Sequence, residues 1–141
     1  MEQIVYQGKI DSDFVGFDQD AIFKMDDGTF WIQTMYRYWY HYEYRPDAVI
    51  LQEDGKYILS VAGESIEVRR LTNVIESTID GKFEGWNKDK EYKLTNGQIW
   101  KQKRYKYEYK YAYRPDVMIA EINGTYIMYV DGTTAEVKRV R

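Results

Sequence analysis

Two runs of alternating tyrosines hold the side chains of this sequence that are best suited to binding chemistry. They are Tyr36, Tyr38, Tyr40, Tyr42 and Tyr44 in the first run, and Tyr105, Tyr107, Tyr109, Tyr111 and Tyr113 in the second. Side chains two residues apart lie on one face of an extended strand, so each run predicts a strand with a row of tyrosines on one side. Such a row could stack on nucleobases or sugar rings, or contact a proline-rich peptide.

The same rows could instead face a core or an interface within the protein. Burying an aromatic side chain removes about 150–250 Å² from water, which is worth roughly 4 kcal/mol at about 25 cal/mol per Å². An unpaired buried hydroxyl group costs about 1–3 kcal/mol. Because the first term is larger, we expect at least part of each row to be buried.

Basic residues gather in the second half of the chain. Residues 1–72 hold 7 Lys+Arg and 13 Asp+Glu, a net charge of −6, whereas residues 73–141 hold 13 and 10, a net charge of +3, and together they give the −3 of the whole chain. The cations interleaved with the second row are Lys103, Arg104, Lys106 and Lys110. Cations beside rings that stack on bases are typical of a groove for single-stranded nucleic acid. The same cations could equally form a solvated face, or contact the acidic half of another molecule.

Trp39 and His41 lie between the tyrosines of the first run, where the second run has Glu108 and Lys110. We interpret them as surface residues on the face opposite the tyrosines, a face that has lost charge as partner-binding faces do. His41 is the only histidine, so it favours neither a metal site nor a catalytic triad. The candidate binding residues are Tyr38, Trp39, Tyr40, Tyr107 and Tyr109 for a protein or peptide, and Lys103, Arg104, Lys106 and Lys110 for a nucleic acid.

No other pattern in the sequence indicates catalysis or metal binding. The chain has no cysteine, which rules out disulfides, thiolate metal sites and a cysteine nucleophile. The carboxylates at 18, 20, 26 and 27 lack the ligand number and spacing of a calcium loop. There is no phosphate-binding glycine loop and no nucleophile elbow. We therefore expect a protein without enzyme activity, cofactor or metal, although chemistry by carboxylates alone stays open.

The elements that position the tyrosine rows repeat along the chain. Shifted by 69 residues, the sequence aligns with itself without a gap. The matched positions include Phe14 with Phe83, Gly16 with Gly85, Trp31 with Trp100, Gln33 with Gln102, and Pro46 with Pro115. We therefore predict an internal duplication with two tandem domains, residues 1–72, which are acidic, and residues 73–141, which carry the basic strand.

Each repeat is expected to be all-β, because short alternating segments are separated by turn signals and no stretch has helical periodicity. The first repeat predicts strands over 10–17, 21–26, 31–44 and 48–51, and two more that contain residues 57–61 and 66–68. We predict type I′ hairpin turns at Asp27-Gly28 and Asn96-Gly97. The strand over 31–44 is long for so small a unit, so we expect it to bend and serve two sheets.

The second repeat resembles a group of small, uncharacterised, tyrosine-rich bacterial proteins. The resemblance is carried by Gly85-Trp86, by the segment from Tyr92 to Gln102, and by the tyrosine row, in the pattern F-x-G-W, F-x-L-x-N-G-Q-x-W-x-Q, Y-x-Y-x-Y-x-Y-x-P. The first repeat departs from the pattern, since Phe17 replaces the tryptophan. The resemblance implies an SH3-like barrel for each repeat, and so two tandem SH3-like small barrels, but no particular activity.

The chain start lacks a basic segment followed by an apolar run, and no apolar stretch reaches the roughly 18 residues of a membrane helix. We therefore expect a soluble, cytoplasmic protein that does not bind a membrane. The favoured function is binding of a protein or peptide through the aromatic residues of the long strands. The alternatives are binding of single-stranded nucleic acid through the basic second strand, and self-assembly in which the acidic half of one molecule contacts the basic half of the next.

Overall fold

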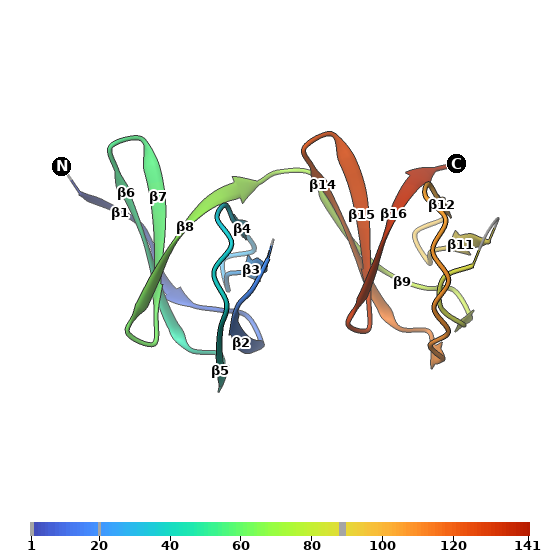
Figure 1. The fold of residues 1–141 in the computed structure, drawn as a ribbon, viewed down its shortest axis with the longest axis horizontal. Helices are drawn as coiled ribbons and strands as arrows, with labels where there is room; N and C mark the ends of the chain where they lie inside the picture. The colour runs from blue at the N-terminus through green and yellow to red at the C-terminus, as the bar shows by residue number, and fades with distance from the viewer. Residues whose placement is uncertain (1, 20, 88–89) are drawn as a thin grey trace. The chain divides into compact units, whose positions relative to one another are not determined.

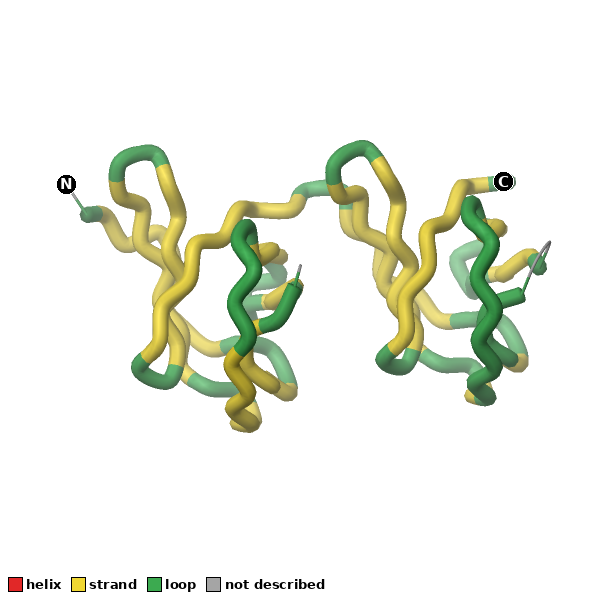
Figure 2. Tube along the Cα trace, in the orientation of Figure 1, coloured by secondary structure: helices red, strands yellow, loops and turns green. Residues whose placement is uncertain are grey.

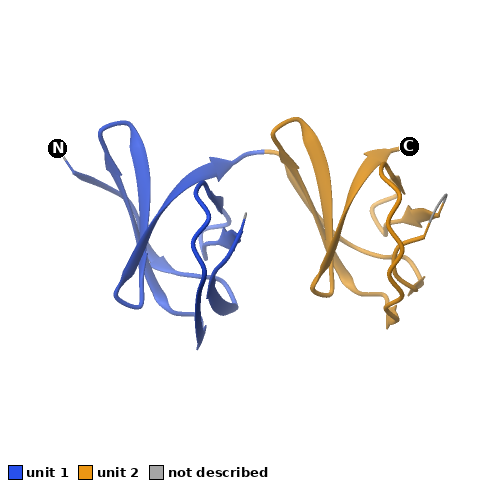
Figure 3. Cartoon of the chain, viewed as in Figure 1, with its two compact units in different colours: residues 1–72 blue, residues 73–141 orange. Residues whose placement is uncertain are grey.

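The protein is described by a computed structural model that covers residues 2–19, 21–87 and 90–141. The strands in this part of the chain are joined by turns and loops, without a helix, so the all-β prediction is confirmed. No helix of the described residues is therefore long and apolar enough to cross a membrane. The chain divides into two compact units, Met1–Thr72 and Asn73–Arg141 (Figure 3).

Each unit contains a curled six-stranded antiparallel sheet, which forms a half-barrel, and a separate two-stranded ladder (Figure 1). The strands of the first unit are β1 (Gln3–Lys9), β2 (Asp13–Phe17), β3 (Ile22–Lys24), β4 (Phe30–Gln33), β5 (Trp39–Tyr44), β6 (Asp47–Glu53), β7 (Lys56–Val61) and β8 (Glu64–Leu71). The large sheet has the order β1-β6-β7-β8-β4-β3, and β2 pairs with β5.

The second unit has the same strand order. Its strands are β9 (Val74–Thr78), β10 (Lys82–Phe83), β11 (Glu91–Lys93), β12 (Ile99–Gln102), β13 (Ala112–Tyr113), β14 (Asp116–Ile122), β15 (Thr125–Val130) and β16 (Thr133–Arg139). The large sheet has the order β9-β14-β15-β16-β12-β11, and β10 pairs with β13.

The predicted strand over 10–17 is wrong, because two strands meet there. β1 ends at Lys9, Ile10 forms a single bridge to Met25, and β2 begins at Asp13. Between them Ser12 has a φ of 89°. A positive φ bends the chain, which here leaves the large sheet and enters the small ladder.

The predicted type I′ turns at Asp27-Gly28 and Asn96-Gly97 are also wrong, since only the glycine of each pair has a positive φ. The Asp27 carboxylate accepts hydrogen bonds from both the amide and the hydroxyl of Thr29. Such local side-chain bonds favour a different turn. Both central residues have a positive φ instead at Asp54-Gly55 and Asn123-Gly124, as a type I′ turn requires.

The predicted continuous strand over 31–44 is wrong, because residues 34–38 lie outside any strand, but its two ends do serve two sheets as predicted. β4 belongs to the large sheet and β5 to the small ladder. In the second unit most of residues 103–111 is extended loop, drawn green in Figure 2, with one bridge between Glu108 and Trp86. We call residues 36–44 and 105–113 the tyrosine segments.

Two buried glutamines hold the beginning of the tyrosine segments. Gln33 Nε2 donates hydrogen bonds to the carbonyls of Met35 and Arg37, at 2.8 and 3.2 Å. Gln102 Nε2 donates in the same way to the carbonyls of Arg104 and Lys106, both at 2.8 Å. A side-chain amide thus satisfies backbone groups where the chain has left the large sheet. The two glutamines occupy matched positions in the sequence, but the sequence pattern predicts no role for them.

Each unit has its own aromatic core. The first core includes Phe14, Phe17, Phe23 and Trp31, and the second includes Phe83, Trp86, Tyr92 and Trp100. These side chains fill the space between the large sheet and the ladder. The core therefore lies directly beneath the tyrosine segments.

Candidate binding surface on the tyrosine segments

The tyrosine rows lie on the outer face of both segments. The five tyrosines of the first row are 56–69% exposed, and those of the second are 52–71% exposed. The expectation that part of each row is buried is therefore wrong. The alternate residues, such as Trp39, His41, Lys106 and Lys110, are half-buried and face the body of the unit.

The reason is that the space beneath each segment is already filled. In the first unit the Trp39 ring lies 5.0 Å from the Phe17 ring and 6.0 Å from the Phe14 ring, between centroids. The His41 ring stacks on Trp39 at 5.1 Å, with 4° between the ring planes. Trp39 and His41 therefore extend the core. Neither shares the outer face of Tyr38 and Tyr40, with which Trp39 was grouped as a binding residue.

A cation of the first segment reaches across to β8. Arg37 Nη2 lies 3.0 Å from Glu64 Oε2, and Nη1 donates to the carbonyl of Ser65 at 2.9 Å. The guanidinium also lies over the Phe17 ring, 5.5 Å from its centroid. These contacts connect the first tyrosine segment to β8 of the large sheet.

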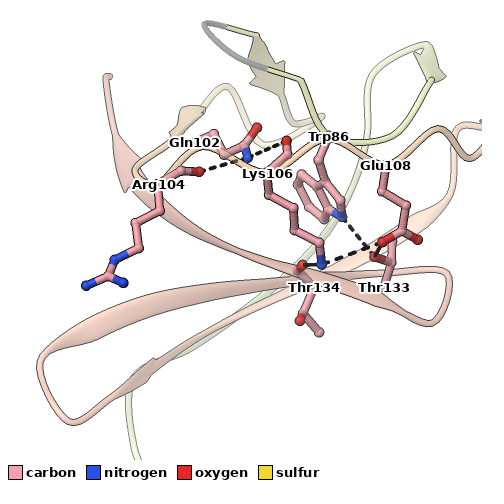
Figure 4. Close-up of polar contacts among 7 residues, drawn as sticks. All are labelled: Trp86, Gln102, Arg104, Lys106, Glu108, Thr133 and Thr134. Carbon is pink, nitrogen blue, oxygen red and sulfur yellow. Dashed lines mark hydrogen bonds and ion pairs between the residues drawn. The ribbon is translucent and has the colours of Figure 1, made fainter.

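The second unit makes the corresponding connection with a chain of polar groups, shown in Figure 4. The buried Trp86 Nε1 donates to Thr133 Oγ1 at 2.9 Å, and this hydroxyl donates to Glu108 Oε1 at 3.1 Å. Lys106 Nζ lies 3.6 Å from the same carboxylate oxygen and donates to the carbonyl of Thr134 at 2.6 Å. Neither Thr133 nor the role of Glu108 was predicted, because the contact joins residues 47 positions apart.

The other predicted basic residues also have acidic neighbours. Arg104 Nε lies 3.1 Å from Glu136 Oε2, and Lys110 Nζ lies 3.9 Å from Asp131 Oδ2. Lys103 is exposed, and the described residues show no ion pair for it. Exposed ion pairs are weak, so these cations can exchange partners, but at present their charge is largely balanced within the unit.

Glycines allow the close approach of the two strands beneath the rows. A β-carbon on Gly16 would lie 1.9 Å from the Trp39 carbonyl oxygen, and one on Gly85 would lie 1.9 Å from the Glu108 carbonyl oxygen. Both glycines also have a positive φ, of 105° and 93°. The position of each tyrosine segment therefore depends on the absence of a side chain on the paired strand.

Besides Tyr6, the hydroxyls of Tyr42 and Tyr92 have raised pKa values. The Tyr42 hydroxyl donates to Asp13 Oδ1 at 3.0 Å, and this hydrogen bond to a carboxylate is the main reason that the pKa of Tyr42 is raised. In the second core, burial raises the pKa of Tyr92 to about 12, and its hydroxyl donates to the Gly85 carbonyl at 2.9 Å. At neutral pH both hydroxyls are protonated donors, as these contacts require.

The described residues include no group of three or more His, Cys, Asp or Glu side chains that could hold a metal ion. A small pocket between β2 and β3 is lined by Ile10–Gly16 and Ala21–Lys24, so no tyrosine of the rows is among its described lining residues. The chain matches no known protein family, no curated protein and no solved structure. The outer tyrosine face is therefore the feature on which a function can be argued.

Proposed function

We propose that the protein is a non-enzymatic binding module of two tandem SH3-like barrels, related by internal duplication, that binds a polypeptide through its outer tyrosine faces. Support for the architecture comes from the identical strand order of the two half-barrels and from the ungapped self-alignment. The contact residues are Tyr38 and Tyr40 in the first unit, and Tyr107 and Tyr109 in the second.

One observation carries this proposal: all ten tyrosines of the two rows face outward, although the alternate positions approach the core. Soluble proteins rarely expose large apolar surfaces to water. Where they do, the exposed surface tends to be an interaction site. Tyrosine offers a rigid ring and a polar hydroxyl, and it is enriched at the energetic centres of protein interfaces.

A polypeptide fits this surface better than a nucleic acid does. Arg104, Lys106 and Lys110 already contact carboxylates, so a phosphate backbone would have to compete with them. The first unit carries an equivalent row on an acidic unit, which would repel phosphates. Binding to single-stranded nucleic acid is therefore the second candidate, supported by the exposed Lys103 beside the second row.

Peptide selection on the full-length chain would test the proposal. Random peptides would be selected on the wild type and on a variant with Tyr38, Tyr40, Tyr107 and Tyr109 changed to serine. A control variant would change Ile4, Val5 and Val140 to serine, which removes exposed apolar surface outside the rows. We expect selected peptides that bind the wild type and the control but lose at least about tenfold in affinity for the row variant.

Peptides that bind the row variant equally well would contradict the proposal. A parallel titration would use a mixed-sequence single-stranded oligonucleotide at low and high salt, with Lys103→Glu and Lys106→Glu. Salt-sensitive binding that these substitutions abolish, without any selected peptide, would replace the polypeptide by a nucleic acid.

A further inference from the structure

The second tyrosine segment leaves one edge of its backbone without a neighbouring strand. Among residues 105–111, the backbone–backbone hydrogen bonds found within the described chain are the two that Glu108 exchanges with Trp86, at 2.7 and 3.1 Å. Successive residues of an extended strand direct their N–H and C=O groups to opposite edges. The backbone groups of Tyr107 and Tyr109 therefore point away from Trp86.

The first segment has the same free edge. Within the described part of the chain β5 pairs with β2 alone, and Trp39 lies opposite Phe17, as Glu108 lies opposite Trp86. The Trp39 carbonyl and the His41 amide both face Gly16. The amide and carbonyl of Tyr40, between them, consequently face the other edge, which we call the free edge of the unit.

On the far side of each free edge, the large sheet is reached by side chains and not by a strand. Arg37 donates to the Ser65 carbonyl in β8, and Lys106 donates to the Thr134 carbonyl in β16. An exposed row of unpaired N–H and C=O groups is a template for pairing with another strand. The barrel of each unit is thus open along a line that a further strand could occupy.

We propose that these free edges pair with a second copy of this chain, the edge of the first unit in one molecule joining the edge of the second unit in the other. Each joint would be an antiparallel strand pair. This interaction goes beyond the proposed function, because it uses backbone groups at the edge and requires no foreign partner.

The net charges of the two units favour pairing of a first unit with a second unit. The first unit has a net charge of −6 and the second +3, so two first units or two second units would repel one another, whereas a first and a second unit attract. The repeat also supplies a matching register. When Tyr36 lies opposite Tyr113, all five tyrosines of one row lie opposite those of the other. Cross-strand aromatic pairs stabilise antiparallel strands.

The test uses two proline variants of the full-length chain, Tyr40→Pro and Tyr109→Pro. Proline removes one backbone donor from the free edge and leaves the bonded edge untouched. Sedimentation velocity of the wild type at low salt should show concentration-dependent association that weakens at high salt. Each proline variant alone should associate at least about tenfold more weakly, the effect expected for losing a ladder hydrogen bond and introducing a ring at the edge.

Mixing the two variants distinguishes unlike from like pairing. Tyr40→Pro keeps an intact second-unit edge, and Tyr109→Pro keeps an intact first-unit edge. The mixture should therefore regain one joint and associate more strongly than either variant alone. Tyr40→Ala and Tyr109→Ala serve as matched controls that remove the ring but keep the backbone donor, and circular dichroism confirms that each variant is folded.

Three results would overturn the proposal. A wild type that is monomeric at every concentration at low salt excludes the pairing altogether. Association that survives in both folded proline variants shows that the free edges are not involved. Association that the alanine variants lose as completely as the proline variants do assigns it to the tyrosine rings, which would leave the proposed polypeptide-binding face intact and remove the edge pairing.

Discussion

The two units support the same outer row by different contacts beneath it. In the first unit the support is aromatic, since Trp39 packs on Phe17 and Arg37 lies over the same ring. The carboxylate that balances Arg37 belongs to Glu64, on β8 of the large sheet. The segment is thus held by ring packing and by one arginine that contacts both the Glu64 carboxylate and the Ser65 carbonyl.

In the second unit the support is polar. The position of Trp39 is taken by Glu108, whose carboxylate lies on the segment itself, and Thr133 connects it to the Trp86 indole. The balancing carboxylate has thus moved from the large sheet to the tyrosine segment. Because the outer tyrosines are retained above two different sets of contacts, the rows are not a by-product of one way of packing the strand.

The largest expected effect comes from the feature that both units share. Gly16→Ala and Gly85→Ala should each lower the free energy of unfolding of their unit by about 3 kcal/mol or more, because a β-carbon would overlap a carbonyl oxygen at a positive φ. Gly28→Ala and Gly97→Ala are matched controls, with a similar φ but open space, and should cost about 1–2 kcal/mol. Hydrogen exchange of the amides in each unit would measure the free energy of unfolding of that unit in all four variants. Equal effects at all four glycines would contradict the close approach.

The next effect should separate the two kinds of support. Trp39→Ala removes a half-buried ring from the first core and should cost about 2 kcal/mol, less than a fully buried tryptophan does. Glu108→Ala, at the equivalent position, should cost about 1 kcal/mol, because the buried Thr133 hydroxyl keeps its hydrogen bond from Trp86 and the partly exposed Lys106 can turn to water. Denaturant unfolding monitored by exchange in β5 and β13 would compare them. If Glu108→Ala proved the more damaging, the polar chain would be the stronger support.

An effect of comparable size tests the polar chain directly. Thr133→Val keeps the shape of the side chain but leaves the buried Trp86 indole without its acceptor, at a cost of about 1–3 kcal/mol. Adding Trp86→Phe, which copies Phe17 of the first unit, removes the donor and should recover part of the loss. Thermal unfolding of both single variants and the double variant would give the interaction free energy between Thr133 and Trp86. Purely additive losses would contradict a bond between the two side chains.

The smallest effect appears only at alkaline pH. The pKa of Tyr92 is about 12 in the folded second unit, above its ordinary value of 10. The resulting stabilisation is complete below pH 10 and is lost as the pH rises toward 12, because the unfolded chain ionises first. Tyr92→Phe copies Phe23 of the first unit and should flatten this decline. The free energy of unfolding of the wild type and the variant would be measured from pH 9 upward. If it declined in parallel with pH in both proteins, the prediction would be contradicted.

Much of the fold follows from local patterns in the sequence. Tyrosine alternation predicts the extended segments, and their length predicts a bend between two sheets. The choice of the buried face does not follow, because the inward positions of the second segment are Lys106, Glu108 and Lys110. Any rule based on hydrophobicity would bury the tyrosines instead. The surface area of a ring determines the free energy that its burial would gain, but it does not show whether the core has room for the ring.

The contacts that hold the segments were equally hidden. Gln33 and Gln102 were visible only as identical positions in two repeats, and their role depends on carbonyl groups that a bend turns toward them. Thr133 differs from its counterpart Glu64, so comparison of the repeats gave no signal at all. Such contacts depend on which distant strands become neighbours, which local periodicity does not encode.

In each tyrosine segment, the residues that form the outer surface alternate strictly with the residues that hold the strand in place. The two sets can therefore change independently. Substitutions at the even positions of the first segment change the outer surface and leave the core untouched, whereas those at the odd positions change how the strand is held. A lineage could therefore alter the outer surface, one ring at a time, without passing through a poorly folded intermediate. With two such strands in one chain, one surface can diverge while the other keeps its original side chains.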